Sequence, residues 1–169
     1  MRFPIGEFEL PAQLSQSSRE ECMDTIASFA ADIHSLTTRL NDTELAKTYR
    51  PDGWNIRQLV HHCADSHMNA FIRFKLALTE DKPSIKPYEE ARWAELSDTL
   101  NMPIDDSLAI IKGVHSRWSV LLNTMDTADF ERVYIHPEHG QLFRLDQALA
   151  NYDWHCKHHL AHINIALTS

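Results

Sequence analysis

Over residues 154–163 the chain reads Trp154-His155-Cys156-Lys157-His158-His159-Leu160-Ala161-His162-Ile163, with four histidines within eight residues. In an α-helix, residues four apart lie on one face a turn apart, so this spacing pairs His155 with His159 and His158 with His162. Two imidazoles spaced in this way can bind one divalent metal, as the histidines of an H-E-x-x-H helix do. The segment therefore predicts a metal site that needs a third ligand from elsewhere in the chain.

The hydrophobic periodicity of this helix indicates which pair faces inward. At about 100° per residue, His159 lies roughly 40° from the centre of the apolar stripe, His155 roughly 80°, His162 roughly 100° and His158 roughly 140°. We therefore expect His155 and His159 to face the core, His158 to face solvent, and His162 to be either a flank residue or a residue that supports a ligand. The alternative is that all four are ordinary surface or packing histidines. The stripe is formed by Leu145, Tyr152, Cys156 and Ile163.

Residues 56–78 offer three further histidines, and periodicity does not choose among them. His67 lies at the centre of an apolar stripe, although a lone histidine there is more often a hydrogen-bonded core residue. His62 lies on the flank of that stripe, in a polar and mostly uncharged strip that suits the wall of a wet pocket. His61 shares a face with charged residues and is expected to be exposed. The polar strip consists of Gln58, His62, Ser66, Asn69 and Arg73.

The same periodicity predicts the fold. Apolar residues recur in alternating steps of four and three over four long segments, which is typical of bundle helices. The sequence thus predicts an all-α four-helix bundle in a single domain, residues 1–169, with a short extra helix and a small hairpin-like insertion before the last helix. The long helices are expected over residues 18–40, 56–78, 104–125 and from 145 onward, the short helix over Pro87–Glu95, and the insertion over residues 130–143.

Local signals mark where these helices begin. Ser18 and Glu21 form a capping-box pattern at the first helix, and Asn55 with Gln58 forms another at the second. Residues 41–53 are expected to be a polar connector. Residues 1–16 predict an extended arm that lies on the surface or on a partner subunit. His115 falls in the stripe of the third helix, either as a fourth ligand or as a packed, hydrogen-bonded residue.

Composition excludes several classes of function. The chain has 43% hydrophobic and 24% charged residues, a net charge of -8 and four glycines, so neither a nucleic-acid partner nor a dinucleotide-binding fold is expected. It has no apolar run of about 20 residues and no signal-peptide pattern, so no membrane association is expected. The three scattered cysteines (Cys22, Cys63 and Cys156) fall at apolar helix positions. They predict reduced core thiols and a cytoplasmic protein.

The histidine-containing segments resemble those of the YfiT-like metal-dependent hydrolases of the DinB-like superfamily. The resemblance runs from Phe3-Pro4-Ile5-Gly6-Glu7 to residue 169. Its longest motif is Gly53-Trp54-Asn55-Ile56-Arg57-Gln58-Leu59-Val60-His61-His62-Cys63-Ala64-Asp65-Ser66-His67-Met68-Asn69. The shorter motifs are Ile72-Arg73-Phe74-Lys75-Leu76-Ala77-Leu78-Thr79-Glu80, Lys86-Pro87-Tyr88, Trp154-His155 and His158-His159-Leu160-Ala161-His162-Ile163.

The resemblance implies a four-helix bundle in which three histidines hold a divalent metal, Zn²⁺ or Ni²⁺. Carried over by motif, the ligands are His62, His155 and His159, so the resemblance selects His62 where burial favours His67. It also implies a homodimer and a small-molecule substrate.

Three hypotheses for the function follow. Three imidazoles with open metal positions suit hydrolysis by metal-activated water, with His67, Asp65 or Arg73 as supporting residues around the site. Some DinB-like bundles resemble thiol S-transferases, in which the metal activates a low-molecular-weight thiol such as bacillithiol. The third hypothesis is a non-catalytic metal-binding stress protein, whose closed site would use His115 or His67 as a fourth ligand.

Overall fold

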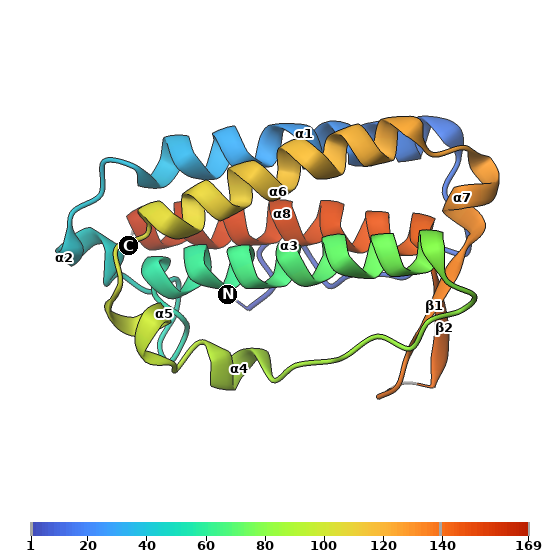
Figure 1. Ribbon diagram of the computed structural model, residues 1–169. Helices are drawn as coiled ribbons and strands as arrows, with labels where there is room; N and C mark the ends of the chain where they lie inside the picture. The colour runs from blue at the N-terminus through green and yellow to red at the C-terminus, as the bar shows by residue number, and fades with distance from the viewer. Residues whose placement is uncertain (1, 139, 169) are drawn as a thin grey trace.

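A computed structural model describes residues 2–138 and 140–168. Within these residues, four long helices confirm the predicted all-α bundle (Figure 1). Each long helix packs against two others, in the order α1, α8, α3, α6 and back to α1. The long helices are α1 (Gln16–Thr37), α3 (Ile56–Thr79), α6 (Asp105–Thr124) and α8 (Leu145–Thr168).

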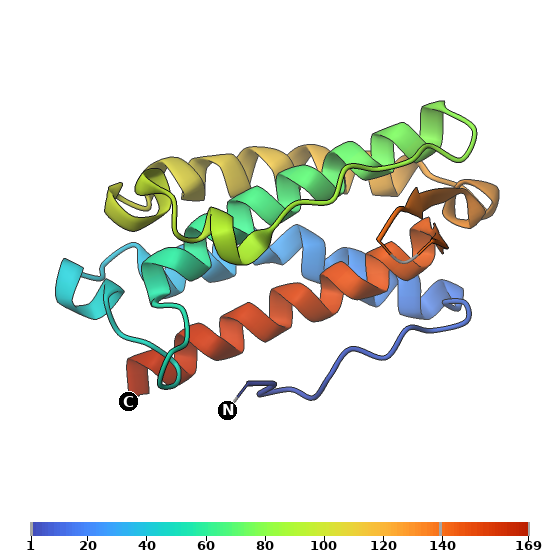
Figure 2. The ribbon, with the colours of Figure 1, turned by 90° about the horizontal axis from the view of Figure 1, so that it is seen from below.

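The helix directions explain why the connection between α3 (Ile56–Thr79) and α6 (Asp105–Thr124) is long. In Figure 1, α1 and α8 run in one direction, and α3 and α6 run in the other. Because α3 and α6 are parallel neighbours, the chain between them must return along the whole bundle. Residues 80–104 make this crossover, which passes along the α3 side of the bundle (Figures 1 and 2). The crossover contains α4 (Glu90–Trp93) and α5 (Ser97–Asn101).

A two-stranded hairpin confirms the predicted insertion. Strand β1 (Val133–His136) pairs antiparallel with β2 (Gln141–Arg144), and Val133 lies opposite Arg144. The short helix α7 (Thr127–Glu131) leads into it. His139, to which no function is assigned, lies outside the described residues.

The structure corrects two predicted helix starts. Helix α1 begins at Gln16 with Ser15 as its N-cap, because the Ser15 side chain accepts from the Ser18 backbone N–H at 3.1 Å. The predicted short helix over Pro87–Glu95 is α4, which begins at Glu90 rather than at Pro87. The segment before it is extended, and Ile85 N–H donates to the Ile135 carbonyl of the hairpin at 3.0 Å.

Asn55 caps α3 as predicted. Its side chain accepts from the backbone of Gln58 at 2.8 Å, and the Gln58 side chain accepts from the backbone of Asn55 at 3.0 Å. The predicted polar connector over residues 41–53 is not all irregular, because it contains the short helix α2 (Asp42–Leu45), which begins at a second capping box at Asn41. These caps satisfy backbone N–H groups that a helix start leaves unpaired.

The core consists of the predicted inward faces. Trp118, Phe29 and Phe74 are among its largest fully buried side chains. Cys22, Cys63 and Cys156 are buried and free, which confirms that they are core thiols rather than a disulfide framework. No helix in the part of the chain described is long and apolar enough to cross a membrane.

The N-terminal arm lies along α8 of its own chain (Figure 2). Gln147 Nε2 donates to the Pro11 carbonyl at 2.9 Å, Trp154 Nε1 to the Gly6 carbonyl at 3.1 Å, and His162 Nε2 to the Arg2 carbonyl at 3.0 Å. The arm therefore covers the α8 face that a helical wheel treats as exposed.

One buried carboxylate joins the arm, the hairpin and α8. Asp146 has 0% exposure and accepts from the backbone N–H groups of Leu14 at 3.3 Å and Gln147 at 2.8 Å. The Arg144 guanidinium donates to both of its oxygens, at 3.0 and 3.1 Å. A buried charge of this kind is stable only while its partners are in place.

We expect Asp146→Ala to lower the free energy of unfolding by about 3 kcal/mol, because it leaves buried donors without an acceptor. Urea denaturation would measure the change. Asp42→Ala is the control, since the Asp42–Arg57 ion pair (2.6 Å) has a 93% exposed carboxylate, and such pairs contribute about 1 kcal/mol or less. An equal loss of unfolding free energy in the two variants would contradict a stabilising role for the buried Asp146 carboxylate.

Candidate metal centre

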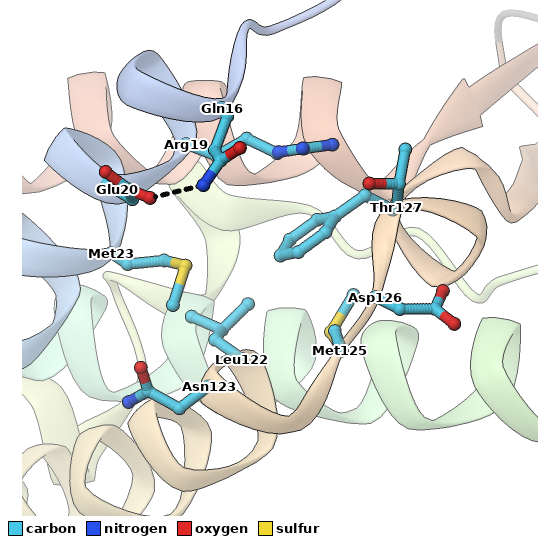
Figure 3. Close-up of a pocket in the computed structure, with 10 residues that line it drawn as sticks. Gln16, Arg19, Glu20, Met23, Leu122, Asn123, Met125, Asp126 and Thr127 are labelled. Carbon is cyan, nitrogen blue, oxygen red and sulfur yellow. Dashed lines mark hydrogen bonds between the residues drawn. The ribbon is translucent and has the colours of Figure 1, made fainter.

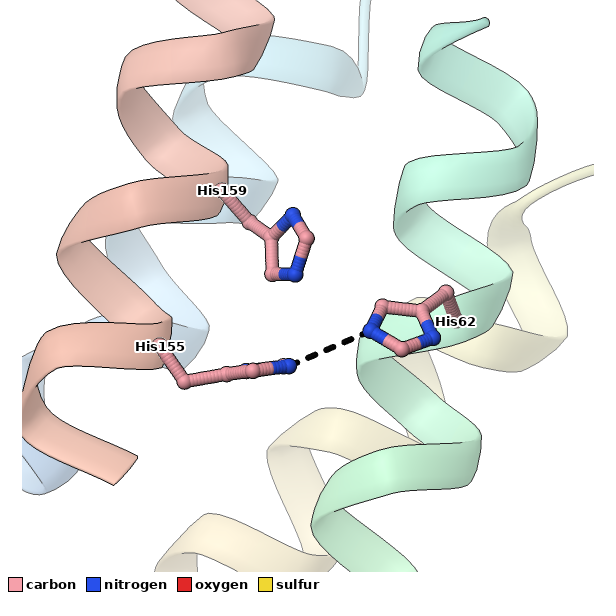
Figure 4. Close-up of side chains that lie close together, drawn as sticks. All are labelled: His62, His155 and His159. Atoms are coloured by element: carbon pink, nitrogen blue, oxygen red, sulfur yellow. Dashed lines mark hydrogen bonds between the residues drawn. The ribbon is translucent and has the colours of Figure 1, made fainter. Parts of the chain in front are cut away.

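His62, His155 and His159 converge between α3 and α8 (Figure 4). Each offers one ring nitrogen, and these three atoms all lie within 4.8 Å of one another. The Nε2 atoms of His62 and His155 are 3.1 Å apart. The structure therefore brings together the inward pair of α8 and the histidine of α3 that the resemblance selected.

The antiparallel packing of α3 and α8 produces this convergence. Tyr152 OH donates to the Ser66 carbonyl at 3.2 Å and fixes the two helices one turn from the site. The Trp54 ring, just before α3, lies 4.7 Å from the His62 ring. These contacts hold the His62 ring against the gap between His155 and His159.

Burial keeps the three imidazoles neutral. It lowers the pKa of His62 to about 4, with a smaller effect from His158, and lowers the pKa of His155 and His159 well below the ordinary value. Desolvation disfavours the charged imidazolium, so each ring keeps one nitrogen lone pair near neutral pH. A metal requires this deprotonated form.

The arrangement fits a divalent metal. Metal–nitrogen bonds of about 2.0–2.1 Å in a tetrahedral site put ligand nitrogens about 3.3 Å apart. The 3.1 Å separation of His62 Nε2 and His155 Nε2 is close to this distance, and a ring nitrogen of His159 lies within 4.8 Å of a ring nitrogen of each. Imidazole suits Zn²⁺ and Ni²⁺ alike, so the donor set does not choose between them.

The three rings line a cavity of about 410 Å³ between the start of α3, α4 and α8. Among its lining residues, Asp52 and Glu90 carry carboxylates and Trp54 supplies an aromatic wall. Periodicity could not identify Asp52 or Glu90, because both lie in irregular segments that the crossover and the turn before α3 bring to the histidines. Burial raises the pKa of Glu90, while the nearby Arg73 opposes this effect.

His67 and His115 are hydrogen-bonded core residues, one of the two predicted alternatives. His67 Nδ1 lies 2.6 Å from His115 Nε2, and His67 Nε2 lies 3.0 Å from His155 Nδ1. His115 Nδ1 donates to the Ile26 carbonyl at 2.6 Å. Neither residue belongs to a histidine group that could hold a metal among the described residues. His67 contacts His155 instead, in the supporting position predicted for it.

His158 is buried, with 6% exposure, and the prediction that it faces solvent is wrong. The Trp154 ring stacks on it at 4.2 Å and the Phe3 ring of the arm lies 6.0 Å away. His158, His159 and His162 form a second group with ligand atoms within 4.8 Å. Their Nδ1 atoms are buried without a hydrogen-bond partner among the described residues. The two groups share His159, so they need to be distinguished by experiment.

His61 is also buried, and the prediction that it is exposed is wrong. Its Nδ1 accepts from the Ser107 hydroxyl at 2.7 Å, and its Nε2 lies 3.3 Å from the Met102 carbonyl. The start of α6 and the end of the crossover cover this face of α3, and no pattern within α3 itself signals such a cover.

Asp65 and Arg73 do not line the histidine cavity. Burial, with the neighbouring Asp98, raises the pKa of Asp65 to about 6. Arg73 lies under the crossover, where its Nη2 is 3.4 Å from the Lys86 carbonyl. Arg73 is linked to this cavity electrostatically, because it opposes the rise in the pKa of Glu90.

Another cavity, of about 400 Å³, lies between α1, the end of α6 and α7 (Figure 3). Its lining contains neither histidine nor cysteine, and Gln16 Nε2 donates there to Glu20 Oε1 at 3.0 Å. It offers the carboxylates of Glu20 and Asp126 but no imidazole or thiol, so it suits a transition metal less well than the histidine cavity does.

Comparison with known proteins places this chain in a family. The DinB superfamily matches residues 25–163. The chain is 39% identical to "Putative metal-dependent hydrolase YfiT" of Bacillus subtilis, covering 96% of this chain and 92% of that one. It is 43% identical to a Halalkalibacterium halodurans protein of the same description, covering 98% and 96%.

Two solved structures have the same fold as this chain. YfiT from Bacillus subtilis, described as having an unusual four-helix bundle topology, superposes with a TM-score of 0.93 over 96% of this chain and 93% of that chain, at 39% identity. The mycothiol-dependent maleylpyruvate isomerase shares the fold, with a TM-score of 0.66 and 16% identity over 86% of this chain and 60% of that chain. The chain therefore belongs to the DinB superfamily and, within it, to the YfiT-like proteins.

Proposed function

We propose that the protein is a metal-dependent hydrolase in which His62, His155 and His159 bind one divalent metal, Zn²⁺ or Ni²⁺. The observation that carries the proposal is the convergence of three neutral imidazoles within 4.8 Å at the wall of a cavity. Three protein ligands leave metal positions open, as in catalytic rather than structural sites. A metal bound there would lower the pKa of water and polarise a carbonyl or phosphoryl oxygen.

Glu90 is the residue best placed to accept the proton of the attacking water. It lines the same cavity as His62 and His155, and desolvation raises the pKa of its carboxyl group, while Arg73 opposes this effect. A cavity of about 410 Å³ holds a small molecule rather than a polymer. The relatives' description as metal-dependent hydrolases supports the same reaction class.

Thiol S-transfer is the second candidate. The same open site could bind a thiolate, because a coordinated thiol is deprotonated. The cysteines of this chain are buried, so the thiol would be a low-molecular-weight co-substrate. A thiol-dependent enzyme shares the fold, although at 16% identity this likeness concerns the fold alone.

A closed, non-catalytic site is less well supported, because His67 and His115, the expected fourth ligands, are hydrogen-bonded to each other.

Homodimer formation and cytoplasmic location stay predictions.

We expect His62→Ala, His155→Ala and His159→Ala each to lose bound metal, because two imidazoles do not hold a divalent ion tightly. Metal per chain would be measured by elemental analysis after metal-free purification and reloading. His61→Ala is the matched control, since His61 is a buried histidine outside both groups.

His162→Ala distinguishes the two histidine groups. If His62, His155 and His159 hold the metal, His162→Ala keeps it at wild-type stoichiometry. Loss in His162→Ala with retention in His62→Ala would assign the metal to the second group and overturn the ligand set.

We expect Glu90→Gln to lower kcat by about 10²–10³-fold with metal content unchanged, because the amide cannot accept a proton. Turnover of a hydrolysed ester or amide in H₂¹⁸O would be followed by mass spectrometry. Glu89→Gln is the control, since Glu89 does not line the histidine cavity and forms an ion pair with Arg92 at 3.8 Å.

The isotope also separates the two reaction classes. Incorporation of ¹⁸O into the product supports hydrolysis. A thiol adduct that forms only with metal and contains no ¹⁸O would establish S-transfer instead.

A further inference from the structure

We infer that His115 and His67 form a hydrogen-bonded relay that holds His155 in the tautomer whose Nε2 is free to bind metal. Both would be positioning residues that act through His155, and neither would touch substrate or metal. The inference rests on the proposed function in one respect, that His155 is a ligand.

The relay crosses the whole bundle. It begins at the Ile26 carbonyl of α1, which lies 2.6 Å from His115 Nδ1 on α6. His115 Nε2 lies 2.6 Å from His67 Nδ1 on α3, and His67 Nε2 lies 3.0 Å from His155 Nδ1 on α8. Each of the four long helices thus supplies one member.

The position of each proton follows from the carbonyl. A carbonyl oxygen only accepts, so His115 Nδ1 must carry hydrogen, and a neutral ring then has a lone pair on Nε2. That lone pair must accept from His67 Nδ1–H, which leaves His67 Nε2 to accept from His155 Nδ1–H. His155 Nε2 is then the unprotonated nitrogen, and it is the atom 3.1 Å from His62 Nε2.

The surroundings favour one proton per ring. His67 and His115 are 0% and 1% exposed, and burial lowers the pKa of both. The Phe29 ring packs 4.9 Å from His67 and 5.1 Å from His115, which restrains both rings. Because the two rings expose almost no surface, reversing one proton would leave buried nitrogens without hydrogen-bond partners.

The relay is suited to holding protons rather than exporting them. Its far end is the Ile26 carbonyl, which cannot take up a proton. A metal-bound histidine commonly donates its second N–H to a fixed acceptor, and this donation sets the tautomer and ring orientation. Here the acceptor is another imidazole, which must itself be oriented. His115 supplies that orientation from the opposite side of the bundle.

The test uses the full-length protein and two variants of His115. His115→Phe keeps an aromatic ring in the core and removes both hydrogen bonds. His115→Gln keeps a side-chain oxygen that can accept from His67 Nδ1–H. His61→Phe is the matched control, because it removes a buried, hydrogen-bonded histidine of α3 that has no contact with the relay.

The first readout is the tautomer of His155 in the metal-free protein, from ¹⁵N chemical shifts of its ring nitrogens. We expect the Nδ1–H form in the wild type, His115→Gln and His61→Phe. In His115→Phe we expect a substantial Nε2–H population, because His67 can then turn its proton toward His155.

The second readout is metal affinity, measured by chelator competition with Zn²⁺ and with Co²⁺. We expect His67→Phe and His115→Phe to weaken binding by about 10–100-fold, the usual effect of removing a partner of a metal-bound histidine. His115→Gln should retain most of the affinity, and His61→Phe should retain all of it.

Two results would overturn the inference. One is an unchanged His155 tautomer in His115→Phe, and the other is an equal loss of affinity in His115→Phe and His61→Phe. Failure of the proposed function gives a different result. Metal retained in His155→Ala would remove His155 from the ligand set, whereas the tautomer of His155 measured in the metal-free wild type would be unaffected.

Discussion

The bundle depends on pairing the ring nitrogens of His67 and His115, the two histidines that lie deepest in its core. An unpaired buried polar group costs about 1–3 kcal/mol, and His67 and His115 are 0% and 1% exposed. Their nitrogens pair with each other, with the Ile26 carbonyl and with His155. This requirement constrains the register of all four long helices, because sliding any one of them would break a bond in the series.

The crossover between α3 and α6 makes that arrangement possible. By returning along the bundle, it lets α6 run parallel to α3, so that His115 lies beside His67 and Ser107 lies beside His61. The same segment lays Glu90 over the cavity that contains His62 and His155. A bundle with short connections between successive helices would have α6 antiparallel to α3 and would lack this covering segment.

The N-terminal arm closes the other side of the site. Its backbone accepts from Trp154 and His162, and its Phe3 ring lies near His158. The α8 histidines thus divide by environment: His155 and His159 meet His62 from α3, whereas His158 and His162 lie beneath the arm. YfiT, which shares this fold, is described as a probable metal-dependent hydrolase.

The sequence by itself determined the four helices, the hairpin insertion and the inward orientation of His155 and His159, because an amphipathic stripe reports which face of a helix is buried. It did not determine the environment of His61 and His158, which are buried by Ser107 and by the arm. Nor could periodicity choose between His62 and His67, since that choice depends on what faces each ring from another helix. Only the tertiary structure paired His67 with His115, and His62 with His155, because contacts between helices depend on register and direction, which no single helix encodes.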